Sequence, residues 1–518
     1  MEGSPVSRGY RAILALREVE FADRMKKGEI LPLIFPHNFS SIFIVVAVLL
    51  VPWPRHNAFR FARHFAFCVV LYLNTLTIVN CRTLGMANSY GVGMGFIWHT
   101  IWSATLLVFR DVQGEFKRIE RTREVRERRS NGVNAEANGH KNLQFWQSEI
   151  SSPGNGGLSK TSGEKTTNSL QCRAKYRWQS YPEKFSHRFT WVLDVSMFSF
   201  RGTGWNWGNP TLPPSVADPP TKYVLMSVLK KTFIHYLRLD LVKILMVRDS
   251  YFWGLVDSPH PPFLAPLGHF AGFFAHIYRH FLIYLGIVSS LTTLHGYLCI
   301  AYLLLSLFYG SSTRITVPIE APWLYRGLFG PFSSVFDYGL AGGWGKWWHQ
   351  IFRYGFVSPS DWMFQYLPRF LRKKPIFLFL RAMIAFMLSG LIHACGSYTQ
   401  FAPTHPLSGP FLFFILQFLG IVAQGLTSHL LSHLPFPLPK WLKQWGNVAF
   451  TITWILLTGP LVANDFSRGG IWLFEPVPIS PLRGFGFGTP DEGWWCWHGK
   501  WFRMWKGEKW WQRGIQIL

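Results

Sequence analysis

The chain has 518 residues, of which 49% are hydrophobic, 17% aromatic and only 15% charged. Soluble globular proteins carry about 25% charged residues, so this composition argues against an ordinary cytosolic enzyme. Lysine and arginine outnumber aspartate and glutamate by 52 to 27, which gives a formal net charge of +25. In a soluble protein this excess would suggest nucleic acid as the partner, but basic residues that flank aromatic, apolar segments are typical of a chain held at anionic lipid surfaces. The six cysteines have no paired spacing, so neither a disulfide framework nor a zinc site is indicated.

The apolar segments predict a membrane protein. Residues 1–29 lack the continuous apolar core of a cleavable signal peptide. A membrane-spanning helix needs about 20 mostly apolar residues, and seven segments approach this requirement: 38–54, 64–80, 88–109, 281–309, 376–397, 409–430 and 447–464. Segment 222–247 is an eighth candidate, but its charged residues would also suit an amphipathic helix at the membrane surface. We therefore expect an all-α, polytopic membrane protein with about seven or eight transmembrane helices.

Residues 110–186 interrupt this pattern. A charged run is followed by a stretch rich in glycine, serine, asparagine and lysine, which predicts a charged helix and then a disordered loop on the cytosolic side. The predicted organisation follows from these changes in composition. It comprises an N-terminal region with the first membrane helices (1–110), a charged cytosolic loop (111–186), a core (187–485) and an aromatic, basic interfacial tail (486–518).

One histidine lies inside a predicted membrane helix. His393 stands in FMLSGLIHACGS, near the end of an almost uncharged segment, and Ser389 precedes it by four residues on the same helical face. Ionisable residues inside a membrane are costly and are functional candidates by default. The alternative is a packing histidine that is hydrogen-bonded to Ser389 or to a backbone carbonyl.

A second group of candidates lies in the basic loop before this helix. Residues 344–353 combine Trp344, Trp347 and Trp348 with Lys346, His349, Gln350 and Arg353. If this stretch is helical, Lys346, His349 and Arg353 share a face that could present cations and hydrogen-bond donors to a phosphorylated ligand. The alternative is a simple interfacial anchor.

These two motifs together carry a family resemblance. WGKWWHQ at 344–350, followed by the intramembrane SGLIH at 389–393, resembles the membrane-bound O-acyltransferase superfamily and specifically its wax-synthase-like branch. RGTGWNWG at 201–208 and GGIWLFEPVPISP at 469–481 are similar to two further signatures of fungal members of that branch, many of which act in terpenoid and meroterpenoid pathways. The loop departs from the family pattern, because Gly343 stands where phenylalanine is usual and Trp347 where arginine is common.

The resemblance implies an acyl-CoA-dependent O-acyltransferase whose helices surround an internal tunnel, with 187–485 as the catalytic core. By position, His393 matches the intramembrane histidine and His349 the second catalytic position. We expect acetyl-CoA, or another acyl-CoA, as a co-substrate, a hydrophobic alcohol as acceptor, and neither a resident metal nor a permanently bound cofactor. The residues assigned to acyl-CoA or to the reacting oxygen are Lys346, Trp348, Gln350, Arg353 and Asn206.

The reaction most compatible with the resemblance is transfer of acetyl to a hydroxyl of a terpenoid or meroterpenoid intermediate in fungal secondary metabolism, at the endoplasmic reticulum. His393 would act as general base, since a neutral imidazole is the usual side chain for removing an alcohol proton. The alternative is a long-chain wax ester synthase that uses a fatty acyl-CoA. His393 follows Lys374 by about 28 Å of straight helix, so we expect the base near the far side of the membrane.

Two hypotheses of other classes remain open. A membrane transporter could use His295 and His393 as a proton relay. The pairs His276/His280 and His429/His433 each place two imidazoles on one helical face, as a metal-dependent oxidase would require. No H-x-x-H-H box accompanies these pairs.

Overall fold

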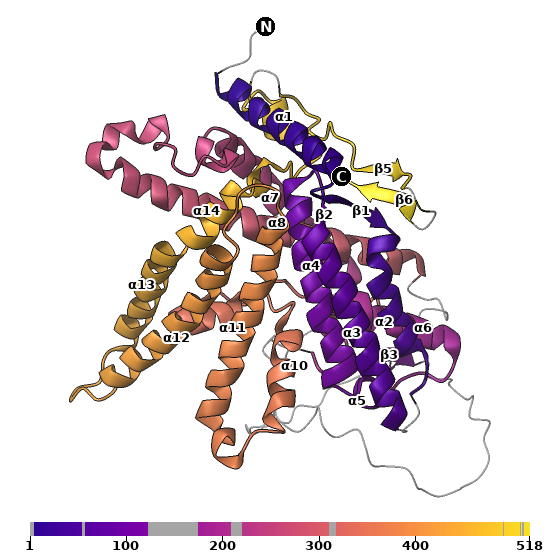
Figure 1. Ribbon diagram of the computed structural model, residues 1–518. Helices are drawn as coiled ribbons and strands as arrows, with labels where there is room; N and C mark the ends of the chain where they lie inside the picture. Colours follow the sequence, from indigo (N-terminus) through magenta and orange to yellow (C-terminus); the bar gives the residue numbers. More distant parts are fainter. Residues whose placement is uncertain are drawn as a thin grey trace, which may run out of the picture.

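Long apolar helices make up most of the computed structural model (Figure 1). The structure describes residues 5–53, 57–122, 175–208, 220–309, 317–489, 492–507, 509 and 512–518. The N-terminal half contains α1 (Pro5–Lys26), α2 (Ser40–Leu50), α3 (Asn57–Asn80), α4 (Met86–Ala104), α5 (Val112–Glu115), α6 (Phe185–Leu193) and α7 (Thr221–Val247). The C-terminal half contains α8 (Ala271–Tyr309), α9 (Ser333–Gly342), α10 (Arg353–Phe364), α11 (Lys374–Tyr398), α12 (Leu412–Leu431), α13 (Lys440–Thr458), α14 (Pro460–Arg468) and α15 (Pro481–Gly484).

Five helical segments among the described residues are long and apolar enough to cross a membrane: Phe61–Asn80, Met86–Phe109, Pro262–Tyr309, Lys374–Tyr398 and Leu407–Leu431. Helices α13 and α14, which are bent by 40° at the break between them, make a sixth span if they cross together. The chain is therefore a multi-pass membrane protein.

The predicted count of seven or eight spans differs from this in two places. Segment 38–54 forms part of the 3-10 turn His37–Phe39 and the 11 residues of α2, which together are too short to span a membrane, and Pro52 follows soon after. Segment 222–247 forms α7, which has 27 residues and packs along α8, but its charged residues exclude it from the apolar spans. Asp240 and Lys243 of α7 are buried within the protein.

Two small sheets correct the prediction of an all-α fold. The first has the order β2-β1-β6-β5, from strands Leu31–Phe35 (β1), Cys81–Arg82 (β2), Phe502–Trp505 (β5) and Gly514–Ile517 (β6). It joins the two ends of the chain, since β1 pairs with β6 in antiparallel register, and Figure 1 shows these strands close to α1. The predicted interfacial tail therefore contributes two of its strands.

The second sheet corrects part of the predicted charged helix. Residues Arg118–Thr122 form strand β3, which pairs with Lys175–Gln179 (β4) in antiparallel register. Tertiary contacts override the local helical pattern here, because Arg118 is buried and donates to Gln179 at 3.0 Å, while buried Glu120 accepts from Arg177 at 2.6 Å. Within the predicted charged and disordered loop of residues 111–186, residues 123–174 lie outside the described residues. From residue 175 on, β4 and the start of α6 replace the expected disorder.

Small residues bring α4 and α11 unusually close together, and Figure 1 shows the two helices running side by side. A Cβ atom on Gly93 would lie 2.0 Å from the Cys395 carbonyl oxygen, and a Cβ atom on Gly396 would lie 2.8 Å from the Tyr90 ring. Close approach through small residues is a common basis of helix association in membranes. This contact places Tyr90 beside His393.

Candidate active site

His393 lies on α11, five residues before the helix ends at Tyr398. Its Nδ1 is 2.8 Å from the hydroxyl oxygen of Tyr90 on α4. Its ring stacks on Phe414 of α12, with centroids 4.6 Å apart and planes inclined by 12°. The partner of the imidazole is therefore Tyr90, and not the Ser389 or backbone carbonyl of the alternative interpretation. None of the described residues hydrogen-bonds to Nε2. The position near the end of α11 agrees with a base far from Lys374.

The loop that carries His349 is not one continuous helix. Residues Gly343–Trp347 form a short π-helical turn, Trp348 adopts an extended backbone conformation, and α10 begins at Arg353. The predicted shared face of Lys346, His349 and Arg353 consequently does not form. This break turns the 348–352 segment away from a helical path and sets the position of His349.

Gln350 and Arg353 brace this loop from within. The Gln350 amide is buried and donates to the carbonyls of Trp344, at 3.1 Å, and Trp348, at 2.6 Å. The Arg353 guanidinium donates to the Gly345 carbonyl and to Gln350 Oε1, both at 3.0 Å. Both residues thus fix the backbone on either side of Trp348 and His349.

An aromatic path connects the two histidines. Phe414, which stacks on His393, lies 5.7 Å from Trp344 between ring centroids. Trp344 is 5.7 Å from Trp348, and Trp348 is 5.3 Å from His349. The two imidazoles are also close enough to interact electrostatically. The structure therefore brings the intramembrane histidine and the loop histidine, predicted from motifs about forty residues apart, into one aromatic region.

His349 is held as a neutral imidazole with an unused nitrogen. Burial lowers its pKa to about 4, and the positive charge of Arg201 adds to this effect. Its Nδ1 is buried and has no hydrogen-bond partner among the described residues. A buried polar atom without a partner costs about 1–3 kcal/mol, and such atoms often mark a site that a ligand completes.

Of the remaining predicted residues, Lys346 and Asn206 lie outside the aromatic path. Lys346 is exposed, and its ammonium sits 3.6 Å from the centroid of the Tyr338 ring. Asn206 is also exposed, and its amide is engaged by the backbone: Oδ1 accepts from Lys117 N at 3.0 Å, and Nδ2 donates to the Glu115 carbonyl at 2.8 Å. Trp348 does lie beside His349, as part of the aromatic path.

Two functional candidates were not singled out from the sequence. Arg201 lies in the RGTGWNWG motif, and its guanidinium donates to the carbonyls of Arg326, at 3.1 Å, and Gly327, at 2.6 Å. Burial, reinforced by Arg326, lowers the pKa of Arg201 to about 10. The motif could have suggested this arginine. Tyr90 gives no local signal, because its contact with His393 spans 303 residues of sequence.

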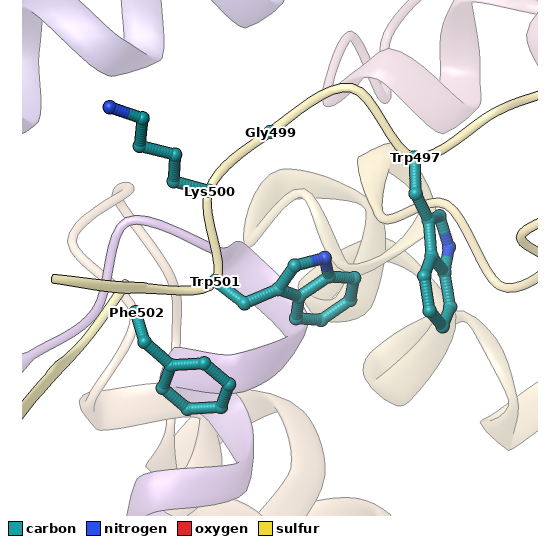
Figure 2. Close-up of a pocket in the computed structure, with 5 residues that line it drawn as sticks. All are labelled: Trp497, Gly499, Lys500, Trp501 and Phe502. Atoms are coloured by element: carbon teal, nitrogen blue, oxygen red, sulfur yellow. The ribbon is translucent and has the colours of Figure 1, made fainter.

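Two surface hollows contain neither His349 nor His393 in their lining. Figure 2 shows a hollow lined by Trp497, Gly499, Lys500, Trp501 and Phe502 of the C-terminal tail. Another is lined by residues of α1 and of segment 398–406, at the end of α11 that lies nearest His393. Within the described ranges, no three His, Cys, Asp or Glu side chains are grouped to hold a metal ion, and His276 Nε2 lies 2.9 Å from the Leu456 carbonyl oxygen.

The fold and this geometry define a multi-pass helical membrane protein with a pair of half-buried histidines in an aromatic region. Residues 325–416, which contain His349 and His393, match the model of the membrane bound O-acyl transferase family. The predicted family resemblance is thereby confirmed, and the matched segment contains the whole aromatic path.

Several named transferases of fungi are distantly similar to this chain. The chain is 28% identical over 282 residues to the O-mevalon transferase macI of Penicillium terrestre, and the aligned region covers 52% of this chain and 60% of the relative. It is 26% identical over 260 residues to the O-mevalon transferase yanI of Aspergillus niger, covering 48% of this chain and 54% of the relative. It is 29% identical over 159 residues to the acetyltransferase aurG of Calcarisporium arbuscula, covering 30% of this chain and 38% of the relative. The chain thus spans about half the length of these relatives, and no solved structure matches it.

Proposed function

We propose that this protein is an acyl-CoA-dependent O-acyltransferase that transfers acetyl from acetyl-CoA to a hydroxyl of a terpenoid-type alcohol. The observation that carries this proposal is the environment of His393. One nitrogen is held by Tyr90 at 2.8 Å, the other has no partner among the described residues, and the ring shares an aromatic region with His349. This arrangement suits a base that must accept a proton from a substrate inside a dry interior.

His393 and His349 would carry out the proposed reaction in the following way. Nε2 of His393 takes the alcohol proton while the oxygen attacks the thioester carbonyl carbon. The tetrahedral intermediate collapses by breaking the carbon–sulfur bond, and the imidazolium returns its proton to the leaving thiolate, which gives the ester and free CoA. Neutral His349 supplies a hydrogen-bond donor for the carbonyl oxygen, and a single donor of this kind contributes about 3–4 kcal/mol in well-studied enzymes.

The acyl donor carries several phosphate charges, and cations gather beside the His349 loop. Arg201 is tied to the backbone at 326–327, and its charge reaches both His349 and His295. The Lys231 ammonium lies close to Gly327, since a Cβ atom there would be 3.2 Å away. We infer that this group, together with the loop, holds the phosphates of CoA, because clustered cations bind phosphate strongly. The thioester would then extend along a tunnel from His349 toward His393.

The choice of acyl group rests on the relatives. Three of them are named acetyltransferases, from Hericium erinaceus, Calcarisporium arbuscula and Humicola fuscoatra. The two named O-mevalon transferases make a mevalon-type group the second candidate. A long-chain wax ester synthase remains the alternative at the level of the family. We place the protein in the endoplasmic reticulum membrane, with the core of residues 187–485 completed by Tyr90 from the N-terminal region.

Membranes that contain the protein should form an ester from acetyl-CoA and a terpenoid alcohol, detected by its mass. Farnesol and ergosterol are suitable acceptors for a first panel, and palmitoyl-CoA is the competing donor. His393→Ala should lower the rate by about 10²- to 10⁴-fold, the usual contribution of a general base. His429→Ala, which changes an exposed histidine on α12, is the matched control and should retain activity.

Three outcomes would contradict the proposal. Ester formation from palmitoyl-CoA alone would replace the acetyl donor by a fatty acyl donor. Full activity in His393→Ala would remove this residue from the mechanism. The absence of thioester-dependent product from every donor and acceptor pair would favour a protein that is not an acyltransferase, such as the transporter considered above.

A further inference from the structure

A second group of buried polar atoms lies behind His393, on the side of Tyr90. Asp465 of α14 is only 2% exposed, and its Oδ1 accepts a hydrogen bond from the backbone nitrogen of His405 at 2.6 Å. Its Oδ2 is buried and has no well-formed hydrogen bond among the described residues, although the Ser397 side chain of α11 is close enough to interact with this carboxylate. A buried carboxylate is costly unless its oxygens are paired. One oxygen of Asp465 holds the His405 backbone, and the second is left to interact with groups on the side of α11.

Tyr90 lies between Asp465 and the imidazole. Its hydroxyl is 2.8 Å from His393 Nδ1, and its ring meets Phe466, the neighbour of Asp465, edge-on at 5.3 Å between centroids. The hydroxyl also interacts electrostatically with Asp465. Gly396 leaves room for the ring, because a Cβ atom at that position would lie 2.8 Å from it. The phenol is thus fixed from three sides, by α11, by α14 and by its own helix.

The direction of the hydrogen bond between Tyr90 and His393 decides whether the histidine can act as a base. If the phenol donates to Nδ1, the ring proton stays on Nε2, and that nitrogen has no lone pair for the substrate. If Nδ1–H donates to the phenol oxygen, Nε2 is free to accept a proton. A negative charge near the phenol attracts the hydroxyl proton and leaves the oxygen lone pairs for Nδ1–H.

We propose that Tyr90 and Asp465 are positioning residues for the base, which select the tautomer of His393 with a free Nε2 and stabilise the imidazolium formed during transfer. This inference rests on the proposed function, and it adds two residues from outside the matched segment of 325–416. Tyr90 accepts from Nδ1–H, and the charge of Asp465 favours this direction of the hydrogen bond and opposes the charge of the imidazolium. A buried acid does the same for the histidine of a serine protease through a direct contact; here a tyrosine stands between them.

Two conservative variants test the pair without changing its packing. Tyr90→Phe keeps the ring against Phe466, and Asp465→Asn keeps the size of the side chain. Each should lower kcat for acetyl transfer to the panel alcohol that the wild type esterifies by about 10- to 100-fold, the usual effect of removing the partner of a functional histidine. The KM for acetyl-CoA should stay within about twofold, because neither residue contacts the donor. Tyr72→Phe, which removes the hydroxyl of an exposed tyrosine on α3, is the matched control.

The double variant Tyr90→Phe/Asp465→Asn sharpens the test. If both residues act through one hydrogen bond to His393, the double variant should be little slower than Tyr90→Phe, since residues that act as a unit are strongly non-additive. Wild-type kcat in Tyr90→Phe, or a rise in KM without a fall in kcat, would overturn the inference while leaving the proposed function intact. Absence of acetyl transfer by the wild type would instead overturn the proposed function. Detergent elution profiles of all variants identify any that fail to fold. If Tyr90→Phe fails to fold, the kcat of Asp465→Asn decides, and a wild-type kcat there would overturn the inference.

Discussion

Two buried polar regions of this protein differ in how completely their groups are paired. The first joins α7 to segment 472–483. The Lys243 ammonium donates to Tyr10 Oη at 2.9 Å and to the carbonyls of Trp472, Leu473 and Phe474 at 2.8, 3.2 and 2.9 Å. Asp240 accepts from Ser480 and from the backbone of Leu482, and Arg483 forms a bidentate pair with Glu475.

The second region surrounds His393 and His349, and there the pairing is incomplete. Asp465 Oδ2 and His349 Nδ1 are buried without partners among the described residues. Buried polar groups are normally satisfied.

In the first region the atoms left unpaired among the described residues are the donors Arg483 Nε and Trp472 Nε1, whereas the carboxylates of Asp240 and Glu475 accept hydrogen bonds through both oxygens. The first region therefore has the character of a structural contact, and the second, with an unpaired carboxylate oxygen and an unpaired imidazole nitrogen, has that of a binding site. The stretch GGIWLFEPVPISP, which resembles a family signature in the sequence, belongs to the first region, so its contacts here are those of a segment that holds the fold together.

The largest predicted effect is a loss of stability when Lys243, in the first region, is replaced. Lys243→Met keeps the aliphatic stem but removes the donor from the carbonyls of Trp472 and Phe474 and from the Tyr10 oxygen, while the Leu473 carbonyl still accepts from the Tyr10 hydroxyl. Hydrogen bonds to charged groups contribute about 1.5–3 kcal/mol each. We expect a clear loss of stability and of protein in the membrane, with kcat per folded molecule unchanged. Thermal unfolding in detergent, combined with activity per folded molecule, measures the two quantities separately.

Lys222→Met, an exposed change at the start of the same helix, is the control and should behave as the wild type. A stable Lys243→Met protein that has lost its catalytic rate would place Lys243 in the active site and remove the distinction between the regions.

A smaller effect, on the KM for acetyl-CoA, should distinguish Arg201 from Lys346 as cations that bind the acyl donor. Arg201→Gln removes a charge next to His349, and we expect the KM for acetyl-CoA to rise about tenfold, equivalent to about 1.4 kcal/mol. Lys346→Gln removes an exposed charge that sits over Tyr338, so KM should change by less than about twofold. Initial rates at varied acetyl-CoA concentrations provide both values. Equal effects from the two substitutions would show that the donor lies along the exposed side of the loop.

The two regions also show which features of the structure could be predicted from the sequence. Helix α11, Lys374–Tyr398, was predicted within two residues because a long apolar run determines it locally. Strand β3 was missed because its partner, β4, lies more than fifty residues away and provides the pairing that overrides the charged pattern. His393 and His349 were found because each stands in a local motif. Tyr90 and Asp465 were not, because their relation to His393 exists only after α4, α11 and α14 have packed together.

The smallest predicted effect concerns the pH dependence of stability at His349. Its pKa is lowered to about 4 by burial and by Arg201, whereas the ordinary value is near 6.5. Between these values the unfolded chain binds a proton that the folded protein does not, so His349 destabilises the fold progressively as pH falls from about 6.5 toward 4.

His349→Gln lacks this penalty but keeps hydrogen-bonding atoms. The wild-type midpoint of thermal unfolding in detergent, relative to His349→Gln, should therefore drop by a few degrees between pH 7.5 and pH 5. A constant difference across this range would mean that His349 is accessible to protons in the folded protein, and the unpaired Nδ1 would then no longer indicate a dry site completed by a ligand.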